Sequence, residues 1–324
     1  MLDTFMDFHS DSESPIRIDT ARIYAGGDSE RQLGYALSAL DDNDKTITIG
    51  TKAHPSQPDG LSPKGIRAQL ESSLDAVKYL SSFGEYYLHQ PDENNSLLDS
   101  LKTLNQLIDE GKISSIGLSN YHASEVQRAF DLCDEHGLAN KPTVYQGLYN
   151  PLNRLVEKDL LPILKKNGCN FVAYNPLAAG LLTGKHSSTG EVKDGRFKNN
   201  ENYMPRFYTP ANFKGLELIQ SACDEANISM VEATYRWMLH HSALGSDDGI
   251  LLGASSVQQL EENLNAMKAE KLPQNIVEAF DAAWNIVAKD EESKPFPYWR
   301  SYSADMPEKD ALDPGASYKA AQAK

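Results

Sequence analysis

The stretch GEYYLHQPDENNSLLDSLKTLNQLIDEGKISSIGLSN (84–120) contains two short runs of apolar, aromatic and β-branched residues, GEYYLHQ (84–90) and KISSIGLSN (112–120), with a helical pattern between them. In that pattern, apolar residues recur at spacings of four, three and four, at Leu97, Leu101, Leu104 and Ile108. This periodicity predicts an amphipathic helix over 96–110, which begins at the N-cap Ser96 and ends at Gly111. A strand, a helix and a second strand in this order indicate a right-handed βαβ unit with parallel strands.

The same alternation continues through most of the chain. Further strands are predicted at 16–21, 46–53, 142–150, 170–177 and 249–255, and further helices at 63–80, capped by Ser62, and at 256–268. The apolar runs are continuous, as is typical of parallel strands covered on both faces. Seven such units without a GxGxxG motif favour a (β/α)₈ TIM barrel over an open doubly wound sheet. The polar stretch 183–210 is predicted to be a long loop on the functional face of this barrel.

Composition excludes several function classes. The 324 residues include 31 basic and 46 acidic side chains, a formal net charge of −15, which opposes binding to nucleic-acid phosphates. The three cysteines show no CxxC spacing, which favours a reducing, cytoplasmic setting over a disulfide framework or a zinc site. No apolar run is long enough for a membrane helix, and the acidic N-terminus is unlike a targeting segment. We expect one barrel domain over 1–300 and a polar, mobile tail over 301–324.

Four titratable residues follow or end the first three predicted strands: Asp19, Tyr24, Lys52 and His89. The carboxyl ends of barrel strands converge on one face, so these side chains are expected to meet there. Each alone has an ordinary interpretation, since a strand-end Asp often caps a loop, and a single His or Tyr is usually a packed core residue. As a group they form a proton-transfer device.

The chemistry of that group follows from the ordinary pKa values. A tyrosine has a pKa near 10 and donates a proton near neutral pH only when its phenolate is stabilised. The ammonium of Lys52 would supply that stabilisation, and Asp19 would keep the lysine charged. His89 could hydrogen-bond a carbonyl oxygen beside the tyrosine. These roles suit protonation of a carbonyl whose carbon receives a hydride.

At this point the sequence resembles a known family. The motifs that carry the resemblance, in chain order, are IDTARIYAGGDSERQLG (18–34), TKAHP (51–55), YYLHQPD (86–92), IGLSNY (116–121), YQGLYNPLNR (145–154), YNPLAAGLLTGK (174–185) and LGASSVQQLEENL (252–264). They are similar to those of the aldo-keto reductases, and most similar to the branch of aflatoxin-aldehyde and succinic-semialdehyde reductases. The resemblance extends from about residue 16 to about residue 300.

The resemblance implies NADPH-dependent reduction of aldehydes and ketones in a metal-free site. Tyr24 would be the general acid, Lys52 and Asp19 its tuning partners, and His89 the residue that orients the substrate. Arg206, Tyr208 and the segment 298–300 would join His89 around a small carbonyl substrate, and a homodimer is implied. The implied cofactor-binding residues are Ser119, Asn120, Gln146, Tyr174, Asn175, Leu177, Gly180, Leu182, Gly184, Lys185, Arg196, Gly253, Ser255, Gln259, Glu262 and Asn263. An ordinary turn at Ser119–Asn120 is the alternative for that pair.

Two further features bear on the cofactor phosphates. Residues 185–206 contain five basic and three acidic side chains in an otherwise acidic chain, which suits a pyrophosphate or 2′-phosphate; on charge alone, a solvated loop fits equally well. The helix predicted after Ser255 presents free N–H groups that suit a phosphate, although capping by Ser256 and Gln259 explains the same residues. GLLTGK (180–185) lacks the spacing of a Walker A motif, which excludes a nucleotide hydrolase of that type.

The N-terminal part departs from the family pattern, in which a hairpin, a first strand and a full first helix precede the IDTA motif. Here fifteen residues precede Ile16, and LDTFMDF (2–8) resembles the end of that helix. We therefore expect a barrel without its first strand, with two open parallel edges. The chain would be an incomplete copy of a reductase or a degenerate member, and the intact Tyr24 group favours the first. A nicotinamide-sensing subunit like the potassium-channel β subunits, or an inactive remnant, are the alternatives to an active enzyme.

Overall fold

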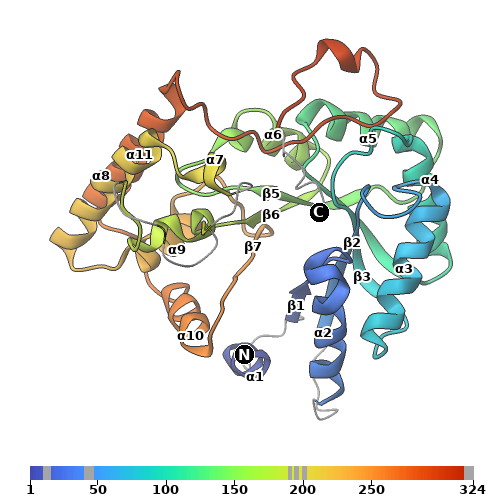
Figure 1. Ribbon diagram of the computed structural model, residues 1–324, viewed down its shortest axis with the longest axis horizontal. Helices are drawn as coiled ribbons and strands as arrows, with labels where there is room; N and C mark the ends of the chain where they lie inside the picture. Colours follow the sequence, from blue (N-terminus) through green and yellow to red (C-terminus); the bar gives the residue numbers. More distant parts are fainter. Residues whose placement is uncertain (10–15, 40–46, 189–191, 193–196, 199–202, 317–324) are drawn as a thin grey trace.

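The computed structural model describes residues 1–9, 16–39, 47–188, 192, 197–198 and 203–316. Its centre is a curved parallel sheet of seven strands in the order β1 to β7, around which the helices are arranged (Figure 1). The strands are β1 (Ile16–Asp19), β2 (Ile47–Ala53), β3 (Phe83–Leu88), β4 (Ile113–Ser119), β5 (Pro142–Leu148), β6 (Asn170–Tyr174) and β7 (Gly249–Ile250). Every strand lies within a run predicted from the sequence or begins one residue before it. The prediction of a (β/α)₈-type barrel that lacks one strand is confirmed.

The α-helices connect consecutive strands or flank the sheet. They are α1 (Leu2–Phe8), α2 (Asp28–Ser38), α3 (Pro63–Val77), α4 (Leu97–Asp109), α5 (Ala123–Glu135), α6 (Leu160–Lys166), α7 (Met204–Phe207), α8 (Pro210–Ala226), α9 (Met230–His240), α10 (Val257–Ala266) and α11 (Gln274–Lys289). Short 3₁₀ helices are η1 (Tyr24–Gly27), η2 (Leu155–Glu157), η3 (Ala178–Thr183) and η4 (Lys309–Ala311).

The predicted helix caps form as expected. Ser62, Ser96 and Ser256 each accept a backbone N–H from the first turn of α3, α4 and α10, respectively. Such a cap typically contributes about 1 kcal/mol to helix stability. In α4, Leu97, Leu101 and Leu104 are buried. The 3.6-residue period therefore identified the face that packs on the sheet.

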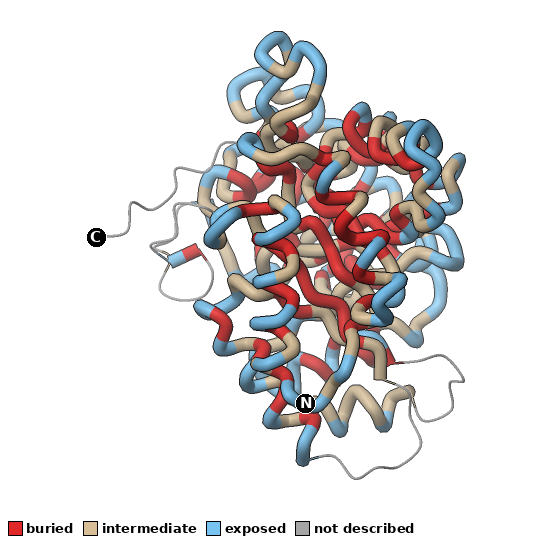
Figure 2. Tube along the Cα trace, turned by 90° about the vertical axis from the view of Figure 1, so that its right-hand side faces the viewer, coloured by how far each residue is buried: buried red, intermediate tan, exposed pale blue. Residues whose placement is uncertain are grey.

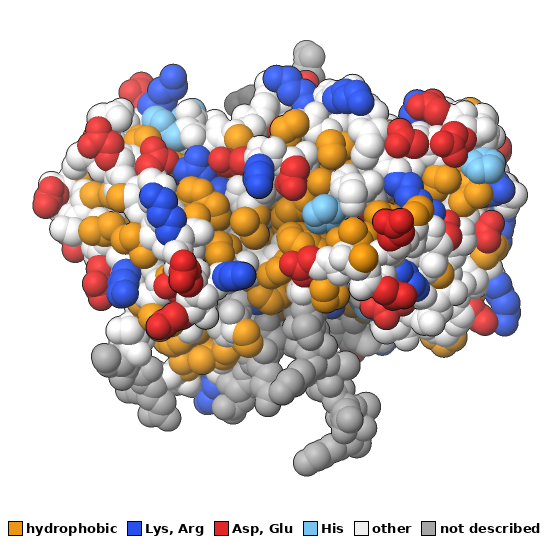
Figure 3. Space-filling view, turned by 90° about the horizontal axis from the view of Figure 1, so that it is seen from above, with side chains coloured by type: hydrophobic (Ala, Val, Ile, Leu, Met, Phe, Trp, Pro, Cys, Tyr) orange, Lys and Arg blue, Asp and Glu red, His pale blue; other side chains and the backbone are white. Residues whose placement is uncertain are grey.

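The hydrophobic core lies between the sheet and its surrounding helices. In Figure 2 the buried residues, in red, lie mainly in the centre of the molecule. Fully buried aromatic side chains on β3, β5 and β6, namely Tyr86, Tyr145 and Phe171, contribute large apolar areas to it. Seen from above, hydrophobic side chains gather across the middle of the molecule, with charged side chains around them (Figure 3).

The sheet does not close in the part of the chain that the structure describes. β1 pairs with β2 and β7 pairs with β6, and no pairing joins β1 to β7. The predicted helical segment 2–8 forms α1, which packs against α10, and the Lys268 ammonium lies 4.4 Å from the centroid of the Phe8 ring. Strand register nonetheless aligns the candidate site, because Ser119 pairs with Gln146 at the carboxyl ends of β4 and β5.

The segment 301–316, which the sequence predicts as part of a mobile tail, lies against α4 and α5. Ser303 is buried and its N–H donates to Glu125, while Asp305 pairs with Arg128. The sequence predicted a mobile tail because this segment is polar and contains few large aliphatic residues. In the structure, hydrogen bonds and charge pairs attach residues 301–316 to α4 and α5. Residues 317–324 lie outside the described part of the chain.

Candidate active site

The four residues predicted to transfer a proton converge at the carboxyl ends of β1, β2 and β3. Asp19 ends β1, Lys52 lies one residue before the end of β2, and His89 follows β3 directly. The Lys52 Nζ donates to both Asp19 carboxylate oxygens, at 2.7 and 2.6 Å, and to the backbone oxygen of Thr20 at 2.8 Å. These bonds use all three ammonium donors and hold the lysine in one place.

Tyr24 begins η1 and packs against two members of the group. Its ring lies edge-on to the His89 ring, with 5.7 Å between the centroids, and the Lys52 Nζ lies 5.3 Å from the Tyr24 ring centroid. Tyr24 is 38% exposed, whereas the Lys52 side chain is fully buried. The phenol is therefore accessible to a small molecule, while the Lys52 ammonium beside it is enclosed.

Burial and neighbouring charges set the protonation states. Burial lowers the pKa of Lys52, and the Asp19 carboxylate, through its charge and its hydrogen bonds, opposes that shift. Burial also lowers the pKa of His89 well below its usual value, as do the charges of Lys52, His54 and Arg300. His89 is therefore neutral at physiological pH. Its buried Nδ1 has no hydrogen-bond partner among the described residues.

A second layer, which the sequence-based prediction missed, surrounds the pair of Lys52 and Asp19. Glu30 is fully buried and accepts hydrogen bonds from Thr51 Oγ1 at 2.7 Å and from the Arg22 guanidinium at 2.6 Å. Its charge also raises the pKa of Lys52. Gly27 adopts φ +94°, and a Cβ there would lie 2.5 Å from the Arg22 guanidinium. The left-handed φ at position 27 therefore favours glycine.

The residues expected to hold a nicotinamide carboxamide also come together. Asn120 Nδ2 bonds Ser119 Oγ at 3.0 Å, and Asn120 Oδ1 accepts the Tyr174 hydroxyl at 2.8 Å. The side-chain amide of Gln146 donates to Asp19 Oδ1 at 2.9 Å, which links this group to the proton-transfer residues. Amide and hydroxyl groups beside an aromatic ring match the donor and acceptor needs of a nicotinamide, so these residues fit that cofactor.

The other predicted cofactor residues form two groups. Around η3, Leu182 is fully buried in the core, while Gly180 has φ +109° and space where a Cβ would lie. Also in this segment are Asn175, Leu177, Gly184 and Lys185, and the last two are exposed. The predicted Arg196 lies outside the described residues.

The second group lies where α10 begins. The Ser255 N–H and hydroxyl both donate to Gln259 Oε1, and Asn263 Nδ2 donates to the Gly253 oxygen at 3.3 Å. Glu262, one turn further along, accepts from Gln258. These hydrogen bonds lie at and near the first turn of α10. They agree with the alternative interpretation given above, in which these residues cap the helix. The exposed helix start remains suited to a phosphate.

Cationic side chains lie on the substrate side. Arg206, on α7, is buried, and its guanidinium carbon lies 4.6 Å from the Phe296 ring centroid and 5.4 Å from that of Tyr203. Burial and the nearby charge of Arg206 lower the pKa of Arg300 to about 9. The predicted Tyr208 donates to the Ser187 oxygen at 3.2 Å, in an aromatic cluster with Phe197 and Phe213.

Arg300 ends the segment 298–300, which the sequence predicts to border the substrate. Its position depends on a backbone hydrogen bond to Asn120, a contact between residues 180 positions apart. Phe296, Tyr298 and Trp299 make this part of the sequence rich in aromatic residues.

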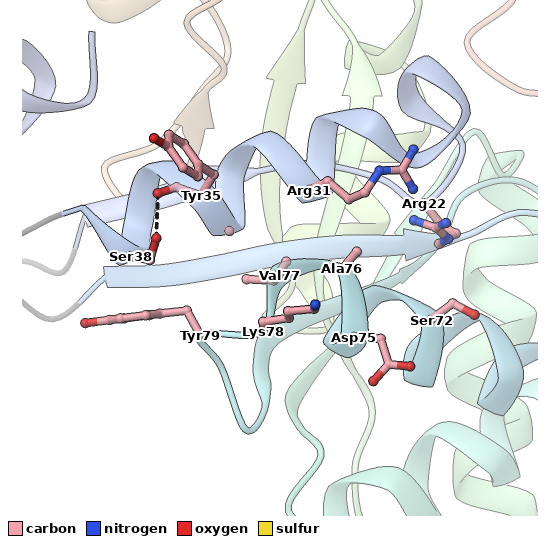
Figure 4. Close-up of a pocket in the computed structure, with 11 residues that line it drawn as sticks. Arg22, Arg31, Tyr35, Ser38, Ser72, Asp75, Ala76, Val77, Lys78 and Tyr79 are labelled. Carbon is pink, nitrogen blue, oxygen red and sulfur yellow. Dashed lines mark hydrogen bonds between the residues drawn. The ribbon is translucent and has the colours of Figure 1, made fainter.

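A surface pocket of about 660 Å³ lies away from these groups, on the outer side of α2 and α3. Figure 4 shows Tyr35 and Ser38 from α2 above Val77, Lys78 and Tyr79 at the end of α3. None of the predicted site residues lines this pocket. Among the described residues, no helix combines the length and the hydrophobicity needed to cross a membrane.

The fold and the site, compared with known proteins, define the class of this protein. It is that of the barrel oxidoreductases of carbonyl compounds. The model of the aldo/keto reductase family matches residues 16–285. The chain belongs to the aldo/keto reductase family, and it is an oxidoreductase of carbonyl compounds that uses a nicotinamide cofactor.

The similar proteins support the predicted branch. The chain is 42% identical over 283 residues to aflatoxin B1 aldehyde reductase member 2 of Rattus norvegicus, covering 84% of this chain and 77% of that protein. It is 41% identical to aldo-keto reductase family 7 member A3 of Homo sapiens, covering 83% and 85%. It is 33% identical to oxidoreductase sirO of Leptosphaeria maculans, covering 89% and 86%. The predicted resemblance is therefore confirmed.

Proposed function

We propose that this protein reduces aldehydes and ketones to alcohols with NADPH, with Tyr24 as the general acid. The observation that carries the proposal is the arrangement of Tyr24, His89 and the buried pair of Lys52 and Asp19 at adjoining strand ends. A bound NADPH supplies the hydride that the carbonyl carbon accepts. The protein's own residues then have to orient the carbonyl and give its oxygen a proton.

The geometry assigns each residue a task in that step. Tyr24, the exposed member, donates its phenolic proton to the carbonyl oxygen as negative charge develops there. The ammonium of Lys52 stabilises the resulting phenolate through the 5.3 Å contact with the tyrosine ring, and Asp19 holds that ammonium. Neutral His89 orients the oxygen by hydrogen bonding, which does not add a second positive charge beside Lys52.

The preference for NADPH over NADH is supported by basic side chains near η3. Lys185 and Lys198 are exposed in the segment where the sequence predicts phosphate contacts. A 2′-phosphate carries the negative charge that such residues attract. Comparison of KM for NADPH and NADH tests this step. The expectation of a homodimeric, cytoplasmic enzyme is a separate proposal that sedimentation and cell fractionation test.

The substrate side supports an aldehyde with an anionic group. The charge of Arg206 lowers the pKa of Arg300, so two guanidinium groups lie near each other on this side. A carboxylate would match their planar donors. We therefore propose higher kcat/KM for succinic semialdehyde than for the neutral 4-nitrobenzaldehyde.

The decisive experiment follows NADPH absorbance with both aldehydes for wild type and Tyr24→Phe. Removing one hydroxyl is expected to lower turnover by about 100-fold or more, because general acids contribute roughly 10²–10⁴-fold, while NADPH binding is retained. Tyr35→Phe, at a tyrosine 79% exposed on α2, is the matched control and should retain wild-type turnover. Cofactor binding without turnover in the wild type would favour a sensing subunit, and absence of both would favour an inactive remnant.

A further inference from the structure

The segment after α11 crosses the loops that follow β3 and β4 and brings Arg300 to the site. The Arg300 N–H donates to the Asn120 oxygen at 2.9 Å, and the Ala304 N–H donates to the Asp92 oxygen at 3.0 Å. The Tyr298 hydroxyl accepts the Ala123 N–H at the start of α5. Figure 1 shows this segment, in red, passing across the top of the molecule toward α5 and α4.

Asp305 attaches this segment to two helices. Its Oδ1 accepts the Leu97 N–H at 2.9 Å, and its Oδ2 accepts the Ser96 hydroxyl at 2.9 Å, both at the start of α4. The Arg128 guanidinium, from α5, lies 2.7 Å from Asp305 Oδ2 and donates to its backbone oxygen at 3.0 Å. A carboxylate at a helix N-terminus is favoured by the helix dipole as well as by these donors.

The buried carboxyl group of Glu125 also attaches this segment to α5. Glu125 is fully buried, and its Oε1 accepts the Ser303 N–H at 2.9 Å. The Arg128 Nη1 lies 3.8 Å from the same oxygen, so Arg128 joins Glu125 to Asp305. Residues 303 and 305 are thus fixed close to Arg300 along the chain.

We propose that Asp305, held by Arg128 and the start of α4, is a positioning residue that fixes Arg300 beside the carbonyl site and so determines preference for anionic substrates. The proposal rests on the proposed reductase function. Asp305 acts through Arg300 and does not touch the reacting atoms. Loss of its carboxylate removes the bonds to α4 and Arg128 and so loosens the segment, while the bonds to Asn120, Asp92 and Glu125 remain.

The test compares Asp305→Asn, Arg300→Met and the double variant on succinic semialdehyde and 4-nitrobenzaldehyde. Asp305→Asn is expected to raise KM for the anionic aldehyde about tenfold, as for loss of a charge-assisted hydrogen bond, with kcat for the neutral aldehyde within about twofold of wild type. Arg300→Met should give the same loss of preference. Because both changes act on one contact, the double variant should be no worse than Arg300→Met alone.

Asp310→Asn is the matched control, since Asp310 is exposed on the same segment. Thermal unfolding and NADPH binding establish that each variant folds. Hydrogen exchange of the Arg300 and Ala304 amides should be faster in Asp305→Asn and unchanged in Asp310→Asn. Unchanged substrate preference, unchanged exchange, or additive effects in the double variant would overturn the proposal.

Failure of the proposed reductase function gives a different result from failure of the Asp305 proposal. If the wild type reduces neither aldehyde, the proposed function is wrong, and calorimetry with succinate and NADPH then reads out the anion site directly. Weaker succinate binding in both Asp305→Asn and Arg300→Met would support positioning by Asp305. Equal binding in wild type and variants would overturn it.

Discussion

The side-chain amide of Gln146 donates a hydrogen bond to Asp19 Oδ1, with 2.9 Å between the two atoms. Gln146 comes from β5 and Asp19 from β1, and Gln146 is only 3% exposed. A residue predicted to hold the cofactor is therefore joined to the pair of Lys52 and Asp19, which we propose tunes the general acid. Cofactor binding and proton transfer are expected to depend on each other through this contact.

Replacing Gln146 tests that dependence. Gln146→Met removes the hydrogen bond at similar size and should weaken NADPH binding and lower kcat, each by about tenfold, because the Asp19 carboxylate loses a donor. Gln146→Glu should be worse, because a second carboxylate would face Asp19. Fluorescence titration with NADPH and steady-state turnover measure the two effects. Wild-type NADPH affinity in both variants would show that Gln146 acts on Asp19 alone.

The pair of Lys52 and Asp19 should respond unequally to loss of either partner. Lys52 is fully buried, whereas the Asp19 side chain is 17% exposed. Asp19→Asn leaves a buried ammonium without its counter-charge and is expected to lower the free energy of unfolding by about 3–5 kcal/mol. Lys52→Met should lower it less, because Asp19 keeps the Gln146 donor and reaches water.

Urea unfolding at pH 7 measures this difference. The control is Arg31→Met, which removes an exposed ion pair with Asp28 and should change stability by less than about 1 kcal/mol. A greater loss in Lys52→Met than in Asp19→Asn would contradict the expected order.

The parts of the site that were predictable depend on local pattern. Continuous apolar runs located the strands, and parallel strands bring their carboxyl ends together, so Asp19, Lys52 and His89 could be grouped before any coordinates were known. Gln146 was identified only through the family resemblance. Its hydrogen bond to Asp19 joins residues 127 positions apart and has no local sequence signal.

The parts that were missed depend on tertiary contacts. Glu30 lies in the first turn of α2, where an acidic residue usually faces solvent and favours the helix dipole. Its burial is explained by the bonds from Thr51 and Arg22, which no helical periodicity reveals. Likewise, the docking of Asp305 depends on Ser96, which lies 209 positions earlier, so polar composition alone suggested a tail.

Glu125 should make the protein less stable as pH rises. Burial raises the pKa of its carboxyl group to about 7, although Ser303 and Arg128 favour the ionised form. Between about pH 4.5 and 7 the folded state keeps a proton that the unfolded state releases, so unfolding becomes more favourable with rising pH. The shift corresponds to roughly 3 kcal/mol, fully expressed above pH 7.

Glu125→Gln should abolish this loss, because an amide stays neutral and its oxygen still accepts the Ser303 N–H. The stability gained over wild type should grow from pH 5 to pH 8 in thermal or urea unfolding. Glu135→Gln, at an exposed position of α5, is the control and should show no such trend. A pH-independent difference between Glu125→Gln and wild type would show that the carboxyl is already ionised in the fold.

His89 should orient the substrate without titrating in the physiological range. Burial and the charges of Lys52, His54 and Arg300 keep its pKa well below the usual value, and burial with Arg300 lowers the pKa of the adjacent His54 to about 4. The plot of log kcat/KM against pH for 4-nitrobenzaldehyde should therefore show no histidine ionisation between pH 6 and 8. His89→Gln should lower kcat/KM by roughly tenfold or more through lost orientation, and leave the shape of that plot unchanged. An ionisation near pH 6.5 in the wild type that disappears in His89→Gln would mean that His89 gains a proton in the working enzyme.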